Sequence, residues 1–248
     1  MSSQWWVTAG TYQAERDFDA SANIAFAAIA REFDFESSLG LNDSPDLFMA
    51  EIGWQFSDKW GLATQYFRSS RSGSRVLEDT FEWQDIVFDV GATADTSTEM
   101  EITRIFFARR FNNEDGPHSL RIGAGLHWLS LEAEVSGEVR LNDMTTDFRR
   151  AAAKAEFPFP NIGAWYRYSP NVNWLMTARV DWLSAGIDNY SGDIWNVSAG
   201  VNYRLWDHIG IGVSYQYFEL GGSLKEPKWR GEIRTTYSGL YLHLSAFW

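Results

Sequence analysis

The chain has 248 residues, a formal net charge of −12 and no cysteine. The missing cysteines exclude disulfide scaffolds, thiol catalysis and cysteine-ligated zinc, and the negative charge argues against nucleic-acid binding, which needs a basic surface. Aromatic residues make up 16% of the chain, including 13 Trp, yet no run of 18 apolar residues occurs, so the sequence predicts no transmembrane helix.

The N-terminal part of the chain predicts one strand and one polar excursion. Residues 5 to 19 suit a strand, and residues 20 to 46 are expected to form the first excursion outside the sheet. Within it, residues 33 to 41 are expected to return toward the mouth of the fold as a plug. Asp34 and Glu36 are the plug candidates, because their carboxylates could meet unpaired arginines inside.

From residue 47 onward the dominant signal is alternation of apolar and polar residues with period two, which indicates strands. Between 195 and 205, for example, apolar residues occupy every odd position. Helical spacing appears only around 22 to 31 and 149 to 156. The strands are expected near residues 47–56, 60–71, 98–111, 119–135, 157–168, 174–186, 195–205, 209–217 and 232–248.

The connections between these strands alternate in length. Short turns are expected at 57–59, 112–118, 169–173 and 206–208, and longer polar segments at 72–97, 136–156, 187–193 and 221–231. Tight turns at one end and long loops at the other are typical of bacterial outer-membrane barrels. Such a sheet must close, because an open edge is not tolerated in lipid.

The strand count predicts a narrow, closed, antiparallel transmembrane β-barrel of about ten strands. The alternative is about twelve strands, with residues 17 to 41 forming another hairpin, but the alanine-rich stretch 25 to 30 suits a periplasmic turn poorly. Barrels of about eight strands are filled by side chains and open porins need about 16 to 18. General diffusion of sugars or peptides is therefore not expected.

A soluble β-sandwich or lipocalin-like barrel is the competing interpretation, and two features favour the membrane. The polar face is rich in Gly, Ser, Asn and Gln but poor in Lys, as suits a packed lumen. Aromatic residues also gather at strand ends, where Trp54 and Trp60 flank one turn and Tyr203 and Trp206 another. Such clustering is typical of an interfacial girdle.

The C-terminal segment 238 to 248 alternates and ends on Trp248. This ending resembles the C-terminal signature of outer-membrane β-barrel proteins, which the barrel-assembly machinery reads. The chain also resembles an uncharacterised proteobacterial barrel family through Trp6, Gly10, Phe35, Glu36, Leu39, Gly40 and Leu41. The resemblance implies a fold, a place in the bacterial outer membrane, and contacts with membrane lipid, lipopolysaccharide and, through Trp248, the assembly machinery. It implies no activity.

Strand parity places four arginines from four consecutive strands on the lumen side. The lumen and constriction candidates are Arg121, Arg167, Arg179, Arg204, Glu51, Asp181, His127 and His243. One interpretation is a filled lumen braced by ion pairs, because buried charges need partners. The other is an anion-attracting constriction, since rings of arginine select anions in pores. The strand at 98–111 stays ambiguous, because either phase exposes a charge.

An enzyme is the less favoured alternative. An omptin-like protease would need an Asp-His pair at the outer rim, but Asp207-His208 falls in a periplasmic turn. A lipid-modifying hydrolase would need a Ser-His-acid arrangement, and His243 has Ser245 beside it without an obvious carboxylate. No catalytic residue, metal or cofactor is predicted.

Residues 1–248 are therefore expected to form a single barrel domain, a porin-like small-solute channel with a possible anion preference or a structural and surface-interaction barrel. Because Met1-Ser2-Ser3 does not resemble a signal peptide, we expect the chain to be the mature form with an added start.

Overall fold

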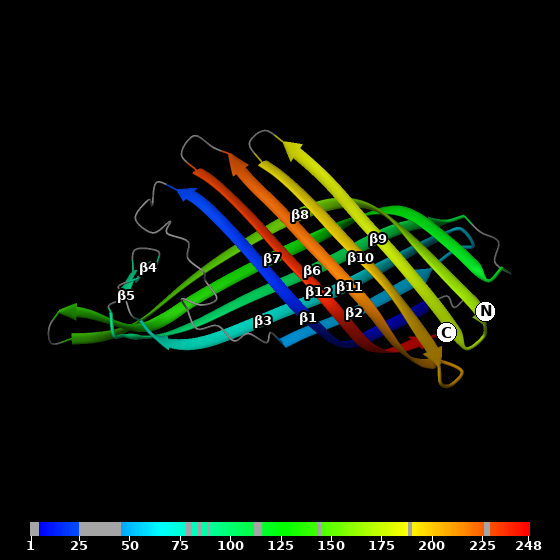
Figure 1. The fold of residues 1–248 in the computed structure, drawn as a ribbon, viewed down its shortest axis with the longest axis horizontal. Coiled ribbons are helices and arrows are strands. Elements are labelled where there is room, and N and C mark those ends of the chain that lie inside the picture. The colour runs from blue at the N-terminus through cyan, green and yellow to red at the C-terminus, as the bar shows by residue number, and fades with distance from the viewer. Residues whose placement is uncertain are drawn as a thin grey trace.

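The computed structural model describes residues 5–24, 46–77, 81–83, 86–88, 90–111, 116–142, 145–187, 190–225 and 229–248, and these residues form an all-β structure (Figure 1). Its strands are β1 (Trp5–Ile24), β2 (Asp46–Gln55), β3 (Trp60–Val76), β4 (Phe81–Trp83), β5 (Ile86–Phe88), β6 (Thr93–Arg110), β7 (His118–Asn142), β8 (Thr145–Asn171), β9 (Trp174–Ile187), β10 (Tyr190–Arg204), β11 (Ile209–Lys225) and β12 (Trp229–Phe247). Within the described residues no helix is long and apolar enough to span a membrane.

Ten of the strands form a closed barrel, in the order β1-β12-β11-β10-β9-β8-β7-β6-β3-β2, and β4 and β5 form a separate two-stranded sheet. All neighbours are antiparallel. β1 closes the ring, since it pairs with β12 from Trp6↔Phe247 onward and with β2 from Trp5↔Trp54. The predicted fold class is confirmed. The twelve-stranded alternative is wrong, because β1 and β2 pair directly and leave no place between them for another hairpin in the ring.

The strands are longer than the sequence predicted. A transmembrane strand needs about 9–11 residues, whereas β8 has 27 and β7 has 25. Much of the expected long segments 136–156 and 221–231 therefore belongs to strands that continue beyond the membrane. The helical spacing expected at 149–156 is wrong as well, since these residues pair with β7. Cross-strand pairing outweighs the low strand propensity of alanine here.

Short turns and both chain ends lie at one end of the barrel (Figure 1). The turn between β8 and β9 is fastened by Asn171, whose Oδ1 accepts hydrogen bonds from the backbone nitrogens of Asn173 and Trp174 at 3.0 and 3.2 Å. The Trp5 and Trp248 backbones exchange hydrogen bonds. The predicted short turns at 57–59, 169–173 and 206–208 are confirmed, whereas most of the turn predicted at 112–118 lies outside the described residues. By the rule for outer-membrane barrels this end faces the periplasm.

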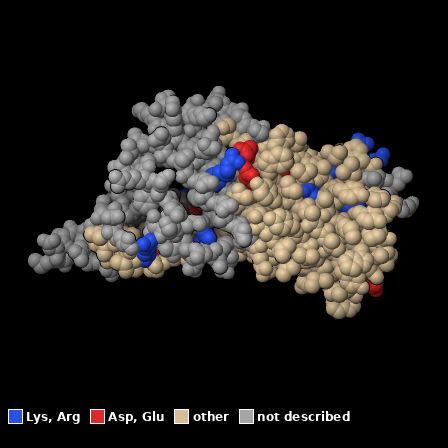
Figure 2. Space-filling model, in the orientation of Figure 1, with Lys and Arg blue, Asp and Glu red and all other residues tan. Residues whose placement is uncertain are grey.

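The outer surface next to this end is apolar. On β10 the odd residues point outward, from Trp195, 41% exposed, to Tyr203, 38% exposed. Trp128 and Trp182 are exposed near the level of Trp195, so aromatic residues bound the apolar band on both sides. At about 3.3 Å per residue and a tilt of about 40°, the span from Trp195 to Tyr203 is about 20 Å high. Figure 2 shows this half of the barrel as a largely uncharged surface, as lipid contact requires.

Beyond the band the barrel wall divides. The β8–β9 ladder ends at Ile162↔Trp182, while β8 stays paired with β7 past Pro158 and Pro160. The pairing of β8 with β7 is unbroken at both prolines, so their nitrogens lie on the edge of β8 that would otherwise pair with β9. Proline has no N–H to donate, so this edge cannot continue the β8–β9 ladder. The β7–β8 hairpin accordingly runs apart from β9 and β10 in Figure 1.

The hydrophobic core lies inside the barrel in two clusters. The first is near the periplasmic end and consists of Trp6, Ala63, Phe106, Ala108 and Trp165. The second fills the outer half and includes Tyr12, Met49, Phe67, Met100, Ile102, Leu129, Ile194, Leu220, Tyr237 and Tyr241. A polar layer lies between them. The sequence predicts a polar, largely filled lumen. The structure has a polar layer at mid-height, and its outer half combines the apolar cluster with buried polar side chains such as Ser69, Arg71 and Thr96.

Candidate functional site: a cationic recess in the lumen

A cavity of about 320 Å³ occupies the periplasmic half of the lumen. Its lining includes turn residues such as Pro117 and Asn173 as well as inward-facing residues of the strands, among them Thr177 and Ser198. Because the turns contribute to its rim, the cavity opens toward the periplasmic end. We call this cavity the recess.

The recess is strongly cationic. Five arginines and one carboxylate line it, namely Arg110, Arg121, Arg167, Arg179, Arg204 and Glu51. Arg179 Nη1 lies 3.1 Å from Glu51 Oε2, and Arg110 donates to the backbone oxygen of Asp58 at 2.6 and 2.9 Å. The positive charge is thus only partly matched by acids, and low-dielectric walls focus the field of the remainder into the cavity.

Trp6 forms one wall of the recess. Its Nε1 donates to Glu51 Oε1 at 3.0 Å, and the guanidinium carbons of Arg167 and Arg121 lie 4.7 and 5.2 Å from its ring centroid. The indole lies flat across β2 because Gly53 has no side chain, since a Cβ there would fall 1.9 Å from Trp6 Cζ2. A glycine on the partner strand therefore sets the position of the aromatic wall.

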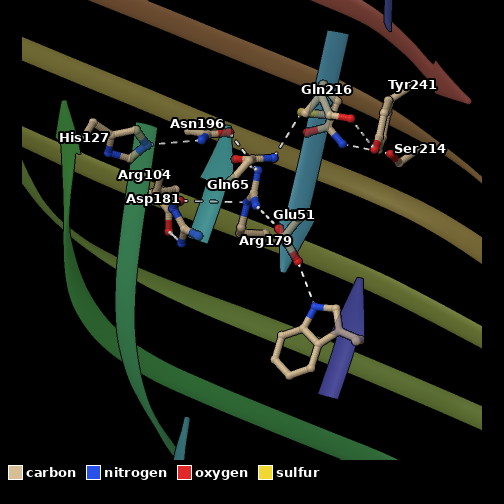
Figure 3. A network of polar contacts seen from close by, with 12 residues as sticks. Glu51, Gln65, Arg104, His127, Arg179, Asp181, Asn196, Ser214, Gln216 and Tyr241 are labelled. Atoms are coloured by element: carbon tan, nitrogen blue, oxygen red, sulfur yellow. Dashed lines mark hydrogen bonds and ion pairs between the residues drawn. The ribbon is translucent and has the colours of Figure 1, made fainter. Parts of the chain in front are cut away.

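A buried polar network crosses the lumen above the recess (Figure 3). Arg104 and Asp181 form its centre, with Arg104 Nε 2.7 Å from Asp181 Oδ2 and both side chains at most 1% exposed. Arg179 Nε lies 3.8 Å from the same oxygen. Gly163 makes room for the carboxylate, because a Cβ there would lie 2.1 Å from Asp181 Oδ1. These ion pairs brace the lumen at mid-height.

The network continues toward His127 through neutral groups (Figure 3). Arg179 Nη2 donates to Gln65 Oε1 at 3.1 Å and to Asn196 Oδ1 at 3.2 Å, and Asn196 Nδ2 lies 3.3 Å from His127 Nε2. His127 is 1% exposed. It is a buried hydrogen-bonding residue and is not part of the recess lining.

A thin partition separates the recess from a second cavity. This cavity measures about 30 Å³ and shares three lining residues with the recess, Met49, Gln65 and Gln216. Gln65 Nε2 donates to Met49 Sδ at 3.1 Å, and the Met49 backbone oxygen accepts from Tyr241 at 2.9 Å. We call Met49, Gln65 and Gln216 the septum. It consists of flexible, uncharged side chains.

An aromatic lid covers the second cavity on its outer side. Tyr12 and Tyr237 both contact Phe67 edge-on, with ring centroids 5.8 and 5.4 Å apart. All three side chains are at most 8% exposed. Together with the outer core cluster, this lid packs across the lumen beside the second cavity.

The second predicted histidine, His243, lines the recess without catalytic partners. Its Nε2 lies 2.7 Å from Asn202 Oδ1, and its ring stacks on Tyr241 at 4.6 Å between centroids. Within the described part of the chain no carboxylate completes a Ser-His-acid arrangement around it. His208, in the turn that follows β10, contacts the Phe247 backbone oxygen at 2.9 Å. The hydrolase alternative gains no support from these residues.

The structure places all eight lumen candidates inside the barrel. Arg121, Arg167, Arg204, Glu51 and His243 line the recess, Arg179 lies between the recess and the network, and Asp181 and His127 belong to the network. The plug candidates Asp34 and Glu36 lie outside the described residues. In the described ranges no three His, Asp or Glu side chains gather where they could hold a metal ion.

Sequence reasoning missed Arg104, Arg110 and Trp6 as lumen residues. β6 carries apolar residues on both faces, with Ile105 and Phe107 outward and Ile102 and Phe106 inward, so periodicity alone leaves its phase open. A usable signal existed in Asp181, an inward-facing acid that needs a buried cation. Only the position of β6 opposite β9 identifies that cation as Arg104.

Known structures share this architecture at low sequence identity. The outer membrane protease OmpT from Escherichia coli has a TM-score of 0.57 at 10% identity, over 98% of this chain and 96% of that one. OprG from Pseudomonas aeruginosa has a TM-score of 0.40 at 9% identity, over 99% and 96%. Ail of Yersinia pestis has a TM-score of 0.39 at 11% identity, over 98% and 99%. No family model and no curated protein matches the chain.

The likeness to OmpT supports the fold and not an activity. The chain has the closed, ten-stranded antiparallel barrel fold that the sequence predicted. The apolar outer band and the aromatic residues at its two edges agree with the predicted location in the bacterial outer membrane.

Proposed function

We propose that the protein is a barrel for small anionic solutes, which enter from the periplasmic end and meet a closure at mid-height. The observation that carries this proposal is the recess, in which five arginines face one carboxylate. Arginine-lined pores favour anions, because the field attracts them and repels cations.

The form of the closure supports a gated passage. The septum has only neutral side chains, and rotamer changes of Gln65 and Gln216 would join the recess to the second cavity. The lid of Tyr12, Phe67 and Tyr237 is the next barrier. It is held by ring contacts and by hydrogen bonds from the Tyr12 hydroxyl to the Gln216 backbone oxygen at 3.3 Å and from the Tyr237 hydroxyl to Ser69 Oγ at 3.4 Å. Opening then requires movement of aromatic side chains in the lumen, so wild-type conductance is expected to be small and intermittent.

Single-channel recording in planar bilayers under a salt gradient tests the proposal. The lid variant Phe67→Ala/Tyr237→Ala should open more often than the wild type, and its reversal potential should show anion preference. Adding Arg167→Gln should reduce that preference. The matched control is Tyr215→Ala, an outward-facing residue that is 52% exposed, and it should leave the conductance unchanged.

A lid variant that folds but stays closed, or that prefers cations, would refute the channel. Folding is checked by the mobility difference between unheated and boiled protein in dodecyl sulfate gels. If the lid variant does not fold, Gln65→Ala/Gln216→Ala tests the septum in the same way.

A structural or surface-interaction barrel is the second candidate. The apolar cluster that fills the outer half of the lumen favours it, since such packing stabilises a barrel without any need for passage. Its partners would be membrane lipid and lipopolysaccharide at the outer surface. Absence of conductance from both the wild type and the variants would favour this role.

A further inference from the structure

Three arginines of the recess have no carboxylate partner among the described residues. Arg121 donates to the neutral Gln55 Oε1 at 2.7 Å, and neither Arg167 nor Arg204 forms an ion pair within the described ranges. The Nε atoms of Arg121 and Arg204 are buried and lack a hydrogen-bond partner there. Buried cations without partners are costly, so these groups are suited to receive an anion.

Aromatic rings orient these three guanidinium groups. Arg121 and Arg167 both lie over Trp6, and Arg204 lies over Phe247 with its guanidinium carbon 4.6 Å from the ring centroid. Phe247 in turn packs against the cluster that contains Trp6. Ring stacking covers the faces of a guanidinium and leaves its N–H edge free, and that edge matches the two oxygens of a carboxylate or phosphate.

We infer that the recess holds a saturable site for one small oxyanion, a carboxylate or phosphate group bound by Arg121, Arg167 and Arg204 beside Trp6 and Phe247. A cavity of about 320 Å³ limits the bound molecule to a small solute, since ligand pockets range from about 300 to 1,000 Å³. This site is a more specific form of the proposed function, and it depends on that proposal only in requiring that the ligand enters from the periplasm. It needs no opening of the septum, so binding and conduction can fail separately.

The test uses the absence of native cysteine. Thr177→Cys places one thiol on the recess wall, where residue 177 is paired with Arg167 across β8 and β9. The full chain in detergent micelles is labelled with a methanethiosulfonate reagent that carries either a sulfonate or a trimethylammonium group. The ratio of the anionic to the cationic labelling rate should be at least about tenfold higher than the same ratio at an exposed reference thiol, because a focused positive field raises the local anion concentration by that order. The reference is needed because a thiolate is itself negative and reacts more slowly with the anionic reagent. Inorganic phosphate or succinate should slow this labelling in a saturable way, and putrescine should not.

Two further variants make the test specific. Arg121→Gln/Arg167→Gln in the Thr177→Cys background should abolish both the rate difference and the protection. Ser57→Cys, in the exposed turn between β2 and β3 and outside the recess lining, supplies the reference ratio of the two rates and should show no protection. If Thr177→Cys does not fold, Ser198→Cys tests the same wall.

Protection by phosphate alone assigns a phosphoryl ligand and protection by succinate alone a carboxylate, and either outcome supports the site. Protection by neither anion, or a ratio of the two labelling rates equal to the ratio at Ser57→Cys, overturns it. Protection in a protein that never conducts would keep the site and remove the channel.

Discussion

The ion pair between Arg104 and Asp181 offers the sharpest test of the lumen packing. Asp181→Asn keeps the size and an oxygen acceptor but removes the negative charge that faces Arg104 at 2.7 Å and Arg179 at 3.8 Å. Both members of the central pair are at most 1% exposed, so water cannot replace the lost charge. Removing one partner of a buried pair costs about 3 to 5 kcal/mol, and we expect about 3 kcal/mol because the amide retains one hydrogen bond. This is roughly a hundredfold change in the folding equilibrium constant.

The assay is reversible urea unfolding from lipid vesicles, followed by tryptophan fluorescence. Glu99→Gln is the matched control, because it breaks a pair with Arg68 at 2.6 Å whose side chains are 34% and 48% exposed. Exposed pairs contribute at most about 1 kcal/mol. Arg104→Met/Asp181→Leu should recover most of the loss, since apolar packing replaces a buried pair well. Equal losses for Asp181→Asn and Glu99→Gln would show that the lumen at Asp181 is hydrated and that the reasoning is wrong.

Three further predictions concern the wall of the barrel. Val201→Arg on the lipid face should lower the free energy of unfolding by about 2 to 4 kcal/mol, because residue 201 lies near the bilayer midplane. Asn202→Arg on the lumen side should lower it less, since that side chain does not enter lipid. Equal losses in the same unfolding assay would contradict the assignment of faces. Gly53→Ala should displace the Trp6 ring, because the new Cβ would lie 1.9 Å from the indole. The recess should then lose its charge-selective labelling of an introduced thiol. Unchanged labelling would argue against the role of that ring. Deleting Trp248 should slow assembly into membranes by the assembly machinery, read as a lower fraction of heat-modifiable barrel; unchanged assembly would exclude this residue as the recognised end.

The outer surface of the barrel could be predicted well from the sequence, and the reason is local. Lipid accepts only apolar side chains, so the period-two pattern of strands such as β10 reports directly which residues face outward. The short turns could be predicted because they interrupt that pattern with polar residues. Closure followed from the physics of unpaired edges in lipid, and the candidates placed inside by parity are inside.

The interior depended on the tertiary structure. Parity tells which side a residue faces but not which residue meets it across the lumen, and Arg104 and Asp181 are 77 positions apart in the chain. Strand parity places Asp181 in the lumen together with the four predicted lumen arginines. In the structure Asp181 pairs first with Arg104, from a strand whose phase could not be read from the sequence because either phase exposes a charge. Arg121, Arg167 and Arg204 form no ion pair with a carboxylate among the described residues. The sequence could not predict this, because the curvature of the closed sheet, and not the order of residues, decides which charged side chains meet in the recess.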